Sequence, residues 1–327
     1  MRFLLTLLTI LGLIFPPIGR RTPRVNATTG SWSMTMMGDI MLDRHVRQSI
    51  TANGQFFPFA KIQSNIKNSG DIVLANLEGP FTTNKTRATS TNLIFTFDPA
   101  MAPVLKQAGI TMVSLANNHT LNFGQAGLDA TRSTLRSAGL DYFGDPKNRA
   151  GYTITKTVNG RRIGFVGYHG LTAGLPVVLD EIRRLRPNVD TLIVMPHWGI
   201  EYNLKFTGRQ QADAHQLIDA GADLVIGSHP HVAEPFEVYN GKFIAYSLGN
   251  FIFDQDWSRD TQEGLTLNLT VSGVQLKVQL IPISISHSQV SLLISPRRTA
   301  MLKRLADTSL VSPAQHQTIK QGSITVP

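Results

Sequence analysis

The sequence contains no cysteine among its 327 residues. This absence excludes disulfide bonds, metal sites built from thiolates and a cysteine nucleophile. It also excludes cleavage as a lipoprotein, which needs a cysteine after the signal. A chain without cysteine fits an exported protein, although the absence alone does not establish export.

Basic stretches interleaved with aromatic residues are also absent, although the net charge is +9 and the pI is about 9.9. The basic excess belongs to the two ends of the chain, and the middle is close to balanced. The residues concerned are Arg2, Arg20, Arg21, Arg24, Arg297, Arg298, Lys303, Arg304 and Lys320. Generic charge at the ends does not indicate a nucleic-acid site, and we predict no nucleic-acid partner.

An uncharged apolar stretch covers residues 3–18, between Arg2 and Arg20-Arg21. Its length and basic start are typical of a secretory signal, and it is short for a transmembrane helix. No Ala-x-Ala cleavage motif follows it. We predict a signal peptide or short N-terminal anchor plus linker over residues 1–30, and an extracytoplasmic protein that is membrane-anchored or secreted. A helix packed in the core is disfavoured, because Pro16-Pro17 would end it abruptly.

Apolar runs of strand length alternate with helical patterns along the chain. Strands are expected at residues 32–37, 71–75, 110–115, 190–195, 222–226, 265–271 and 274–281. Helices are expected at residues 43–50, 58–67, 99–108, 125–138, 177–186, 207–220 and 296–306. Asn159-Gly160 and Asn240-Gly241 each indicate a hairpin turn. The order predicts an α/β fold with mixed sheets covered by helices, in one domain over residues 31–308, followed by a disordered tail over residues 309–327.

Polar side chains follow five of the expected strands, at the point where each strand ends. Because open α/β sheets bind ligands at the carboxyl ends of their strands, we expect these side chains to converge. Carboxylate, amide and imidazole donors suit Zn, Mn or Fe, and a pair of ions about 3.5–4 Å apart would need a bridging carboxylate. The residues are Asp39, Glu78, Asn118, His119, His197, His229 and His231.

Each of these residues alone also has an ordinary structural explanation. The carboxylates fit helix caps or turns, the asparagine fits a turn, and the histidines fit the core or a polar loop. The joint pattern favours a metal site, because four of the nine histidines fall at these strand ends. We expect structural roles for His45, His215, His287 and His316.

Six motifs in order along the chain resemble the CapA-type poly-γ-glutamate capsule-synthesis family, which is related to calcineurin-like metallophosphoesterases. The resemblance covers about residues 34–280. The motifs are Gly38-Asp39-Ile40-Met41, Asn76-Leu77-Glu78, Ala116-Asn117-Asn118-His119, Pro196-His197-Trp198-Gly199, Gly227-Ser228-His229-Pro230-His231 and Tyr246-Ser247-Leu248-Gly249-Asn250-Phe251.

The resemblance implies a four-layer α/β/β/α sandwich of two mixed sheets, metallophosphatase-like, with one or two divalent ions (Mn, Zn, Fe or Mg). The implied metal ligands are Asp39, Glu78, Asn118, His197, His229 and His231. His119 matches the histidine that protonates a leaving group or steadies a phosphoryl oxygen, and His119 and Asp39 are the predicted catalytic residues. Candidate contacts to substrate are Arg44, Asn117, His169 and Asn250.

Two positions depart from the phosphoesterase pattern. Met41 stands where the first motif has a histidine, and a thioether is a poor ligand for a hard ion. Glu78 stands where the phosphoesterases have a bridging aspartate. With one donor missing beside His231, we expect His229→Ala to lose more metal than His231→Ala.

The sequence therefore predicts an exported protein of capsule or poly-γ-glutamate biosynthesis with a metal-dependent, hydrolase-type site. A water activated by the metal would attack a phosphoester or an amide, with His119 as acid. The predicted partners are an anionic cell-surface polymer or its precursor, the membrane through the N-terminal segment, and a polymer synthase complex. The alternative is a non-catalytic component of a synthesis or export complex that keeps a degenerate metal site.

Overall fold

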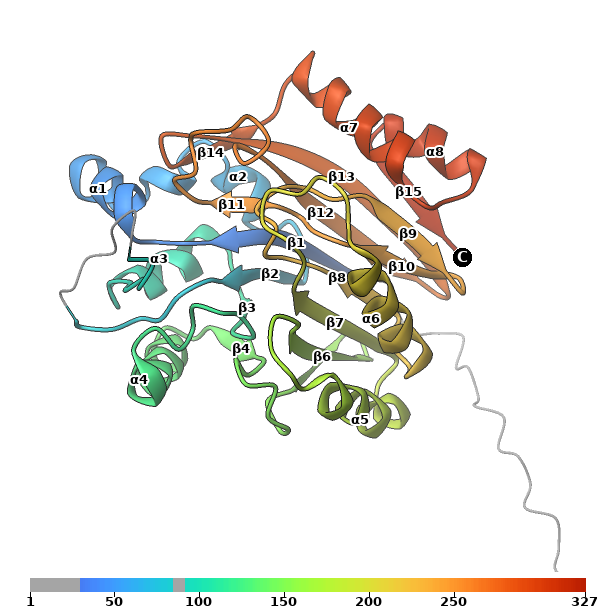
Figure 1. The fold of residues 1–327 in the computed structure, drawn as a ribbon, viewed down its shortest axis with the longest axis horizontal. Helices are drawn as coiled ribbons and strands as arrows, with labels where there is room; N and C mark the ends of the chain where they lie inside the picture. Colours follow the sequence, from blue (N-terminus) through green and yellow to red (C-terminus); the bar gives the residue numbers. More distant parts are fainter. Residues whose placement is uncertain (1–29, 85–91) are drawn as a thin grey trace, which may run out of the picture.

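Two β-sheets packed face to face, with helices on their outer sides, form the protein (Figure 1). The computed structural model describes residues 30–84 and 92–327. The predicted signal or anchor over residues 1–30 therefore lies, apart from its last residue, outside the described residues. Within the described ranges, no helix has both the length and the apolar character that crossing a bilayer requires.

The larger sheet has nine strands in the order β14-β13-β12-β1-β2-β3-β4, with β11 beside β1 and β15 beside β13. Strands β1, β2, β3 and β4 run parallel, whereas β12, β13, β14 and β15 pair antiparallel, so the sheet is mixed. Its strands are β1 (Trp32–Ile40), β2 (Ile72–Leu77), β3 (Met112–Ser114), β4 (Asp141–Phe143), β11 (Asn250–Ile252), β12 (Glu263–Ser272), β13 (Gln275–Ser286), β14 (Gln289–Leu292) and β15 (Ser323–Val326).

The smaller sheet has six strands in the order β5-β6-β7-β8-β10-β9. Strands β6, β7, β8 and β10 are parallel, and the hairpins predicted at Asn159-Gly160 and Asn240-Gly241 add the antiparallel edge strands β5 and β9. The strands are β5 (Ile154–Val158), β6 (Arg161–His169), β7 (Thr191–His197), β8 (Leu224–Ile226), β9 (Phe236–Tyr239) and β10 (Lys242–Ala245).

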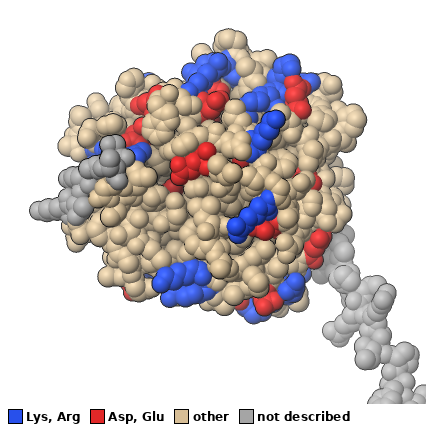
Figure 2. Space-filling model, viewed as in Figure 1, with Lys and Arg blue, Asp and Glu red and all other residues tan. Residues whose placement is uncertain are grey.

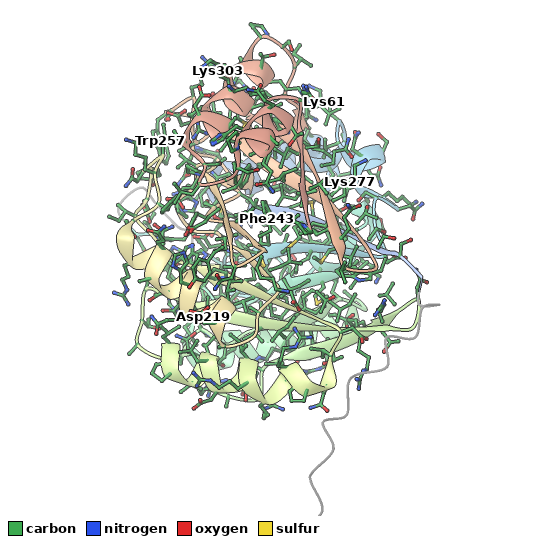
Figure 3. All side chains as sticks on the ribbon, turned by 90° about the vertical axis from the view of Figure 1, so that its right-hand side faces the viewer. Lys61, Asp219, Phe243, Trp257, Lys277 and Lys303 are labelled. Carbon is green, nitrogen blue, oxygen red and sulfur yellow. The ribbon has the colours of Figure 1, made fainter. Side chains whose placement is uncertain are left out.

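Alternating side chains along the strands separate the interior into layers, as a period of two requires. In β2, Ile72 and Leu74 join the core between the two sheets, whereas Val73 and Ala75 face the helices of the larger sheet. In β7, Ile193 and Met195 face the larger sheet, and the intervening side chains pack under α5 and α6. Figure 3 shows Phe243 in the interior and Asp219 and Lys303 on the outer helices. The predicted four-layer α/β/β/α sandwich is confirmed.

The helices of the two outer layers follow the predicted order. They are α1 (Arg44–Asn53), the 3-10 helix η1 (Phe57–Phe59), α2 (Gln63–Ile66), α3 (Met101–Ala108), α4 (Gly124–Ser137), α5 (Leu175–Leu185), the 3-10 helix η2 (Arg186–Asn188), α6 (Gly208–Asp219), α7 (Arg297–Thr308) and α8 (Pro313–Lys320). The helix expected over residues 58–67 is divided into η1 and α2.

The prediction of a disordered tail over residues 309–327 is wrong. Ser312 begins α8 with a capping box, in which its hydroxyl accepts from the Gln315 N–H and the Gln315 side chain accepts in return. After this helix, β15 pairs with β13 and buries Ile324 and Val326 in the core. The short polar segment is ordered because its helix is capped and its alternating apolar residues pack in the core when β15 pairs with β13.

Charges of both signs are interspersed on the face of the molecule shown in Figure 2. Several basic residues near the C-terminus have acidic partners: Arg297 pairs with Glu263, and Lys303 and Lys320 pair with Asp307. Because of these ion pairs, acidic neighbours partly offset the positive charge of the C-terminal region.

Candidate metal centre

The carboxyl ends of β1, β2, β3, β7 and β8 meet at one edge of the sandwich, and each of the seven predicted side chains there lies close to another of them. Asp39, at the end of β1, has no exposed surface. Its Oδ1 accepts from Nδ2 of Asn76 at 2.8 Å, and its Oδ2 accepts from the His229 N–H at 3.1 Å. Asp39 therefore joins the larger sheet to the His-Pro-His turn of the smaller one.

Glu78 follows β2 and reaches the centre of the group. Its Oε1 lies 3.7 Å from Nε2 of His231, 3.8 Å from Nε2 of His119 and 4.0 Å from Nε2 of His197. The residue has no exposed surface, and neither oxygen has a hydrogen-bond partner among the described residues. Burial raises the pKa of Glu78 well above its usual value, while the nearby His231 opposes that rise.

These distances test whether the residues fit a divalent ion. Donor atoms bound to one ion at about 2.0–2.2 Å lie roughly 3–4 Å from each other. The imidazole nitrogens around Glu78 lie within or close to that range, and a buried carboxylate without hydrogen bonds is costly unless a cation or donor compensates it. The residues therefore fit a divalent ion, and Asp39, Glu78 and His231 form one group of donors within 4.8 Å of one another.

His197 and Asn118 form a second group beside Glu78. Nε2 of His197 lies 2.9 Å from Oδ1 of Asn118, a spacing that also suits two ligands of one ion. On the other side of the ring, Nδ1 lies 3.0 Å from Oγ of Ser228. Burial, followed by the electrostatic interaction with the neighbouring His229, lowers the pKa of His197 well below its usual value.

The two histidines of the Gly227–His231 turn sit in strained backbone. A Cβ at Gly227 would lie 2.0 Å from the Tyr246 carbonyl oxygen, so only glycine fits there. His229 and His231 have φ of 98° and 60°, which non-glycine residues rarely adopt. Both residues with strained backbone present their rings to the site, and backbone strain of this kind is common at functional sites.

The same two rings have opposite electrostatic surroundings. Burial lowers the pKa of His229 to about 3. Burial also opposes the charge of His231, but Glu78 and Asp39 outweigh it and raise the His231 pKa to about 9. We call Asp39, Glu78 and His231 the carboxylate half, and Asn118, His197 and His229 the imidazole half.

His119 stands between the two halves, after β3. Its Nδ1 donates to Oδ1 of Asn122 at 3.1 Å, and its ring packs on Phe95 with centroids 4.2 Å apart. Burial lowers the pKa of His119 to about 4. The ring is neutral at pH 7, with Nε2 available on the side of Glu78.

Met41 takes no part in the site. Its side chain is buried in the core, and its sulfur accepts from the Asp43 N–H at 3.0 Å.

The structure places two of the four candidate substrate contacts inside the fold. Asn117 is fully buried and holds the turn, because its side chain bonds Asn76, Leu77, His119 and Thr120. Asn250 is fully buried as well; its Oδ1 accepts from Nδ1 of His231 at 2.9 Å. Both asparagines therefore make hydrogen bonds within the chain, and their contact with substrate stays a prediction.

Arg44 and His169 lie beside the site. Two nitrogens of the Arg44 guanidinium bind the Asp254 carboxylate, and the group lies 5.4 Å from the centre of the Phe95 ring. His169 pairs with His197 across β6 and β7, with ring centroids 6.3 Å apart. Nδ1 of His169 donates to the Pro146 carbonyl, and Nε2 is buried without a partner among the described residues. Both remain candidates for contact with substrate.

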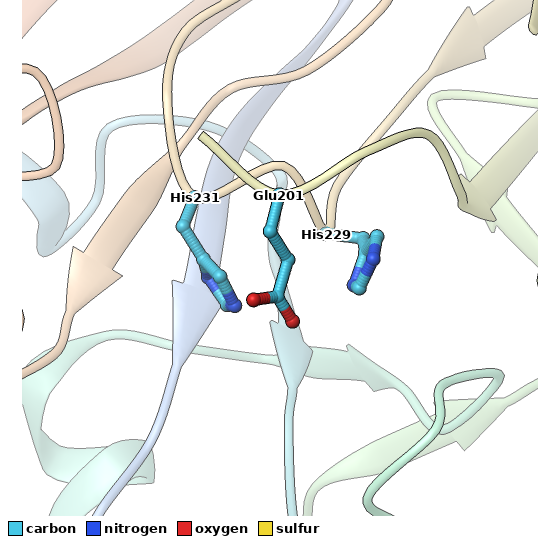
Figure 4. A group of neighbouring side chains, drawn as sticks. All are labelled: Glu201, His229 and His231. Atoms are coloured by element: carbon cyan, nitrogen blue, oxygen red, sulfur yellow. The ribbon is translucent and has the colours of Figure 1, made fainter. Parts of the chain in front are cut away.

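Glu201 is a candidate ligand that the sequence analysis missed. It lies in the loop after β7, four residues beyond His197, and Figure 4 shows its side chain between His229 and His231. One donor atom from each of these three residues lies within 4.8 Å of the others. The available signal was an acidic residue shortly after a candidate ligand, in a strand-end loop.

Comparisons with known proteins agree with the motifs. A family model described as bacterial capsule synthesis protein PGA_cap matches residues 33–255. The capsule biosynthesis protein CapA of Bacillus anthracis is 33% identical over 280 residues, which cover 78% of this chain and 68% of that protein. The PGA biosynthesis protein CapA of Bacillus subtilis (strain 168) is 32% identical over 264 residues, covering 75% of this chain and 69% of that protein.

Solved structures are more distant. A 5'-nucleotidase from Candida albicans SC5314 gives a TM-score of 0.42 at 13% identity, covering 72% of this chain and 46% of that chain. Vps29 from Chaetomium thermophilum gives a TM-score of 0.35 at 15% identity, covering 80% of this chain and 93% of that chain. This chain thus spans less than half of the nucleotidase.

Proposed function

The chain belongs to the bacterial capsule synthesis protein family PGA_cap, and from that premise we propose a metal-dependent hydrolase of capsule or poly-γ-glutamate biosynthesis. The proposed bond is a phosphoester or an amide. The family predicted from the six motifs is thereby confirmed, whereas the hydrolytic role is the proposal. The observation that carries it is Glu78, a buried carboxylate with no hydrogen bond from the described residues and with three imidazole nitrogens 3.7 to 4.0 Å away.

A divalent ion, when bound, lowers the pKa of water and stabilises negative charge that develops on the substrate. Asp39, Glu78 and His231 would hold one ion, and Glu78, Asn118, His197 and His229 a second. Nδ1 of His231 donates to Asn250, which leaves its Nε2 as the free donor atom on the side of Glu78. Orientation of a ligating imidazole through its other nitrogen is usual in metal sites.

His119 is placed to move a proton. Because Nδ1 donates to Asn122, Nε2 is the atom that takes up a proton and returns it to a leaving group. The packing on Phe95 fixes the plane of the ring. Only a small part of the His119 side chain, 13%, is exposed, so the ring reaches the surface from a rigid position.

The surroundings fit an anionic substrate with apolar parts. Arg44 is held by Asp254 and lies against Phe95 and Phe253, so its charge has a fixed place beside the site. Ile200 and Trp257 are exposed, at 58% and 62%. A cavity of about 370 Å³ runs beside the loop after His197, with Trp198, Ile200 and Arg209 in its lining.

We also propose that the protein acts outside the cytoplasm, on a cell-surface polymer or its precursor and together with a polymer synthase complex. The apolar stretch over residues 3–18 supports export. Membership of a capsule synthesis family supports a role with a cell-surface polymer. Fractionation of cells producing the full chain should recover it with the membrane or the medium. Recovery in the cytosolic fraction alone would contradict export.

Turnover by the purified full chain tests the hydrolase. The protein is stripped with EDTA, reloaded with Mn²⁺ or Zn²⁺, and given p-nitrophenyl phosphate, bis-p-nitrophenyl phosphate and γ-glutamyl polymer. We expect turnover that needs the ion and that falls by about 100-fold or more in His119→Ala, the order expected of a general acid. Bound metal with no turnover of any substrate would contradict a hydrolase.

The buried Met41 in place of a ligand favours a second function, a non-catalytic component of the synthesis complex. Polymer output of cells that carry His119→Ala separates the two. Unchanged output would favour the non-catalytic component, and lost output would favour the enzyme.

A further inference from the structure

We propose that Glu201 is a further metal ligand, which approaches the two rings of the His-Pro-His turn and gives the carboxylate half a preference for Mn²⁺. The inference rests on the proposed metal centre and adds a ligand that the six motifs do not contain.

The position of Glu201 is the first support. Its carboxylate lies between the rings of His229 and His231, one from each half of the site (Figure 4). Glu78 is completely buried, whereas Glu201 is exposed. The two carboxylates therefore reach the histidines from the interior and from solvent.

The loop that carries Glu201 is fixed to the turn that carries the histidines. The Tyr202 N–H donates to the Pro230 carbonyl at 2.8 Å. Tyr202 has a φ of 65°, a strained value for a residue with a side chain. Gly199 has a φ of 93°, and a Cβ there would lie 2.7 Å from the Gln210 amide nitrogen. Glu201 is thus presented by a constrained loop.

A chain of hydrogen bonds connects His231 to Tyr202, the residue that follows Glu201. Nδ1 of His231 donates to Asn250, Nδ2 of Asn250 donates to Oε1 of Gln255 at 2.9 Å, and Nε2 of Gln255 donates to the Tyr202 hydroxyl at 3.2 Å. The Tyr202 ring stacks on His231 with centroids 6.1 Å apart, and Tyr202 directly follows Glu201 in the chain. The same network thereby fixes His231 and the residue next to Glu201.

Two buried groups without partners are independent signs of a ligand. Both oxygens of Glu78 and Nδ1 of His229 lack hydrogen-bond partners among the described residues. Glu78 is wholly buried, and His229 is 5% exposed. Native proteins rarely leave such groups unsatisfied, and bound cations at this edge of the sandwich would satisfy them.

The donor chemistry then separates the two halves. Glu201 is connected to the carboxylate half through His231, which belongs to both groups of donors. The proposal assigns Glu201 to this half, which then offers oxygens from Asp39, Glu78 and Glu201 beside the imidazole of His231, a set that suits Mn²⁺. The imidazole half offers nitrogens from His197 and His229, which suit Zn²⁺. Glu201 supplies the donor that Met41 does not.

Metal binding by the full-length chain tests the proposal. Protein stripped with EDTA is titrated with Mn²⁺ and, separately, with Zn²⁺ by isothermal titration calorimetry, and bound metal is counted by mass spectrometry. We expect Glu201→Gln to weaken Mn²⁺ binding by at least about 10- to 100-fold, the loss typical of disturbing even an outer partner of a ligand. Zn²⁺ binding should stay within a few-fold of the unsubstituted chain.

Asp180→Asn is the matched control, because it removes one carboxylate charge from an exposed position on α5, where Asp180 pairs with Arg183 of the same helix. Asp180→Asn should bind Mn²⁺ as the unsubstituted chain does. Glu201→Asp keeps the carboxylate and should recover part of the affinity, which separates loss of a ligand from loss of fold. Circular dichroism should show that all three variants unfold at the temperature of the unsubstituted chain.

Three results would overturn the proposal. Mn²⁺ affinity unchanged in Glu201→Gln would remove Glu201 as a ligand while the proposed metal centre stands. An equal loss of Mn²⁺ affinity in Asp180→Asn would show that the effect comes from the general surface charge and not from a ligand. Failure of the unsubstituted chain to bind either ion would overturn the metal centre and, with it, the role of Glu201.

Discussion

The two halves of the candidate metal centre are buried to a similar depth, yet their histidines differ by several pKa units. In the imidazole half, burial lowers the pKa of His229 to about 3. In the carboxylate half, His231 is equally enclosed, but Glu78 and Asp39 raise its pKa to about 9. Burial disfavours the charged form of any imidazole, and a nearby carboxylate reverses the result.

This difference shows that the fold determines where the ligands lie, whereas their neighbours determine the charge of each histidine. The strand ends bring all six ligands to one edge whatever their charge. The neighbours of each ring then decide its state: His197 faces the Asn118 amide and the Ser228 hydroxyl, whereas His231 faces two carboxylates. One half is a set of neutral nitrogen donors, and the other is rich in negative charge.

The largest effect should come from the residue that the two halves share. Glu78→Gln keeps the size of the side chain but removes the charge that lies within 4.0 Å of three imidazoles. We expect it to weaken Mn²⁺ and Zn²⁺ binding alike, by more than the 10- to 100-fold typical of outer partners. Metal content after purification measures this, and loss of only one ion would show that Glu78 is not shared.

Substitution of one histidine at a time should remove a different metal ion from each half of the site. His231→Ala should lose mainly Mn²⁺, and His229→Ala mainly Zn²⁺, because their neighbours differ. The sequence alone predicted the greater total loss for His229→Ala, on the ground that Met41 leaves the His231 side without a donor. Because Glu201 lies near both rings, we now expect comparable total losses with different metals. Loss of the same metal in both variants would contradict two distinct halves.

A smaller effect should follow from the hydroxyl of Tyr202. Tyr202→Phe keeps the ring stacked on His231 but removes the hydrogen bond that the Tyr202 hydroxyl accepts from Gln255. We expect Mn²⁺ binding to weaken by about 10-fold, the lower end for an outer partner, with Zn²⁺ binding unchanged. Titration with each ion checks this, and a larger loss of Zn²⁺ than of Mn²⁺ would contradict the network.

The smallest effect on metal should come from a buried carboxylate outside both halves. Burial raises the pKa of Glu234 to about 8, although its hydrogen bond from Gln210 opposes the rise. A raised acid binds its proton in the fold, so this residue makes the protein less stable as pH rises from about 4.5 to about 8, by at most about 1.4 kcal/mol per pH unit.

Glu234→Gln should therefore bind metal normally and be more stable than the unsubstituted chain at pH 8, with little difference at pH 5. Chemical unfolding of the stripped protein at both pH values measures the change. Equal stability at pH 8 would show that Glu234 keeps an ordinary pKa.

The ligand positions were predictable because they obey a simple rule. Asp39, Glu78 and His197 each come at or just after the end of a strand, and the carboxyl ends of parallel strands meet at one edge. Apolar runs and alternating apolar residues likewise predicted most strands of both sheets, but not the short strands β4, β11, β14 and β15. These features depend on local sequence, which a single chain displays.

Roles that depend on contacts between distant side chains were not predictable. Asn117 and Asn250 sit in the motifs beside the candidate ligands, and the sequence does not show that their side chains bond to Asn76 and His231. Glu201 was missed because a loop, rather than a strand end, carries it back to the site. The tail was misjudged because β15 is ordered by pairing with β13, a strand that is distant along the chain. The local sequence of the tail does not show this pairing.

Anomalous diffraction from crystals of the full chain grown with both Mn²⁺ and Zn²⁺ tests the two-halved metal centre most directly. We expect a manganese peak among Asp39, Glu78, Glu201 and His231, and a zinc peak among Glu78, Asn118, His197 and His229. The absence of any peak at this edge of the sandwich, with both ions in excess, would contradict the account.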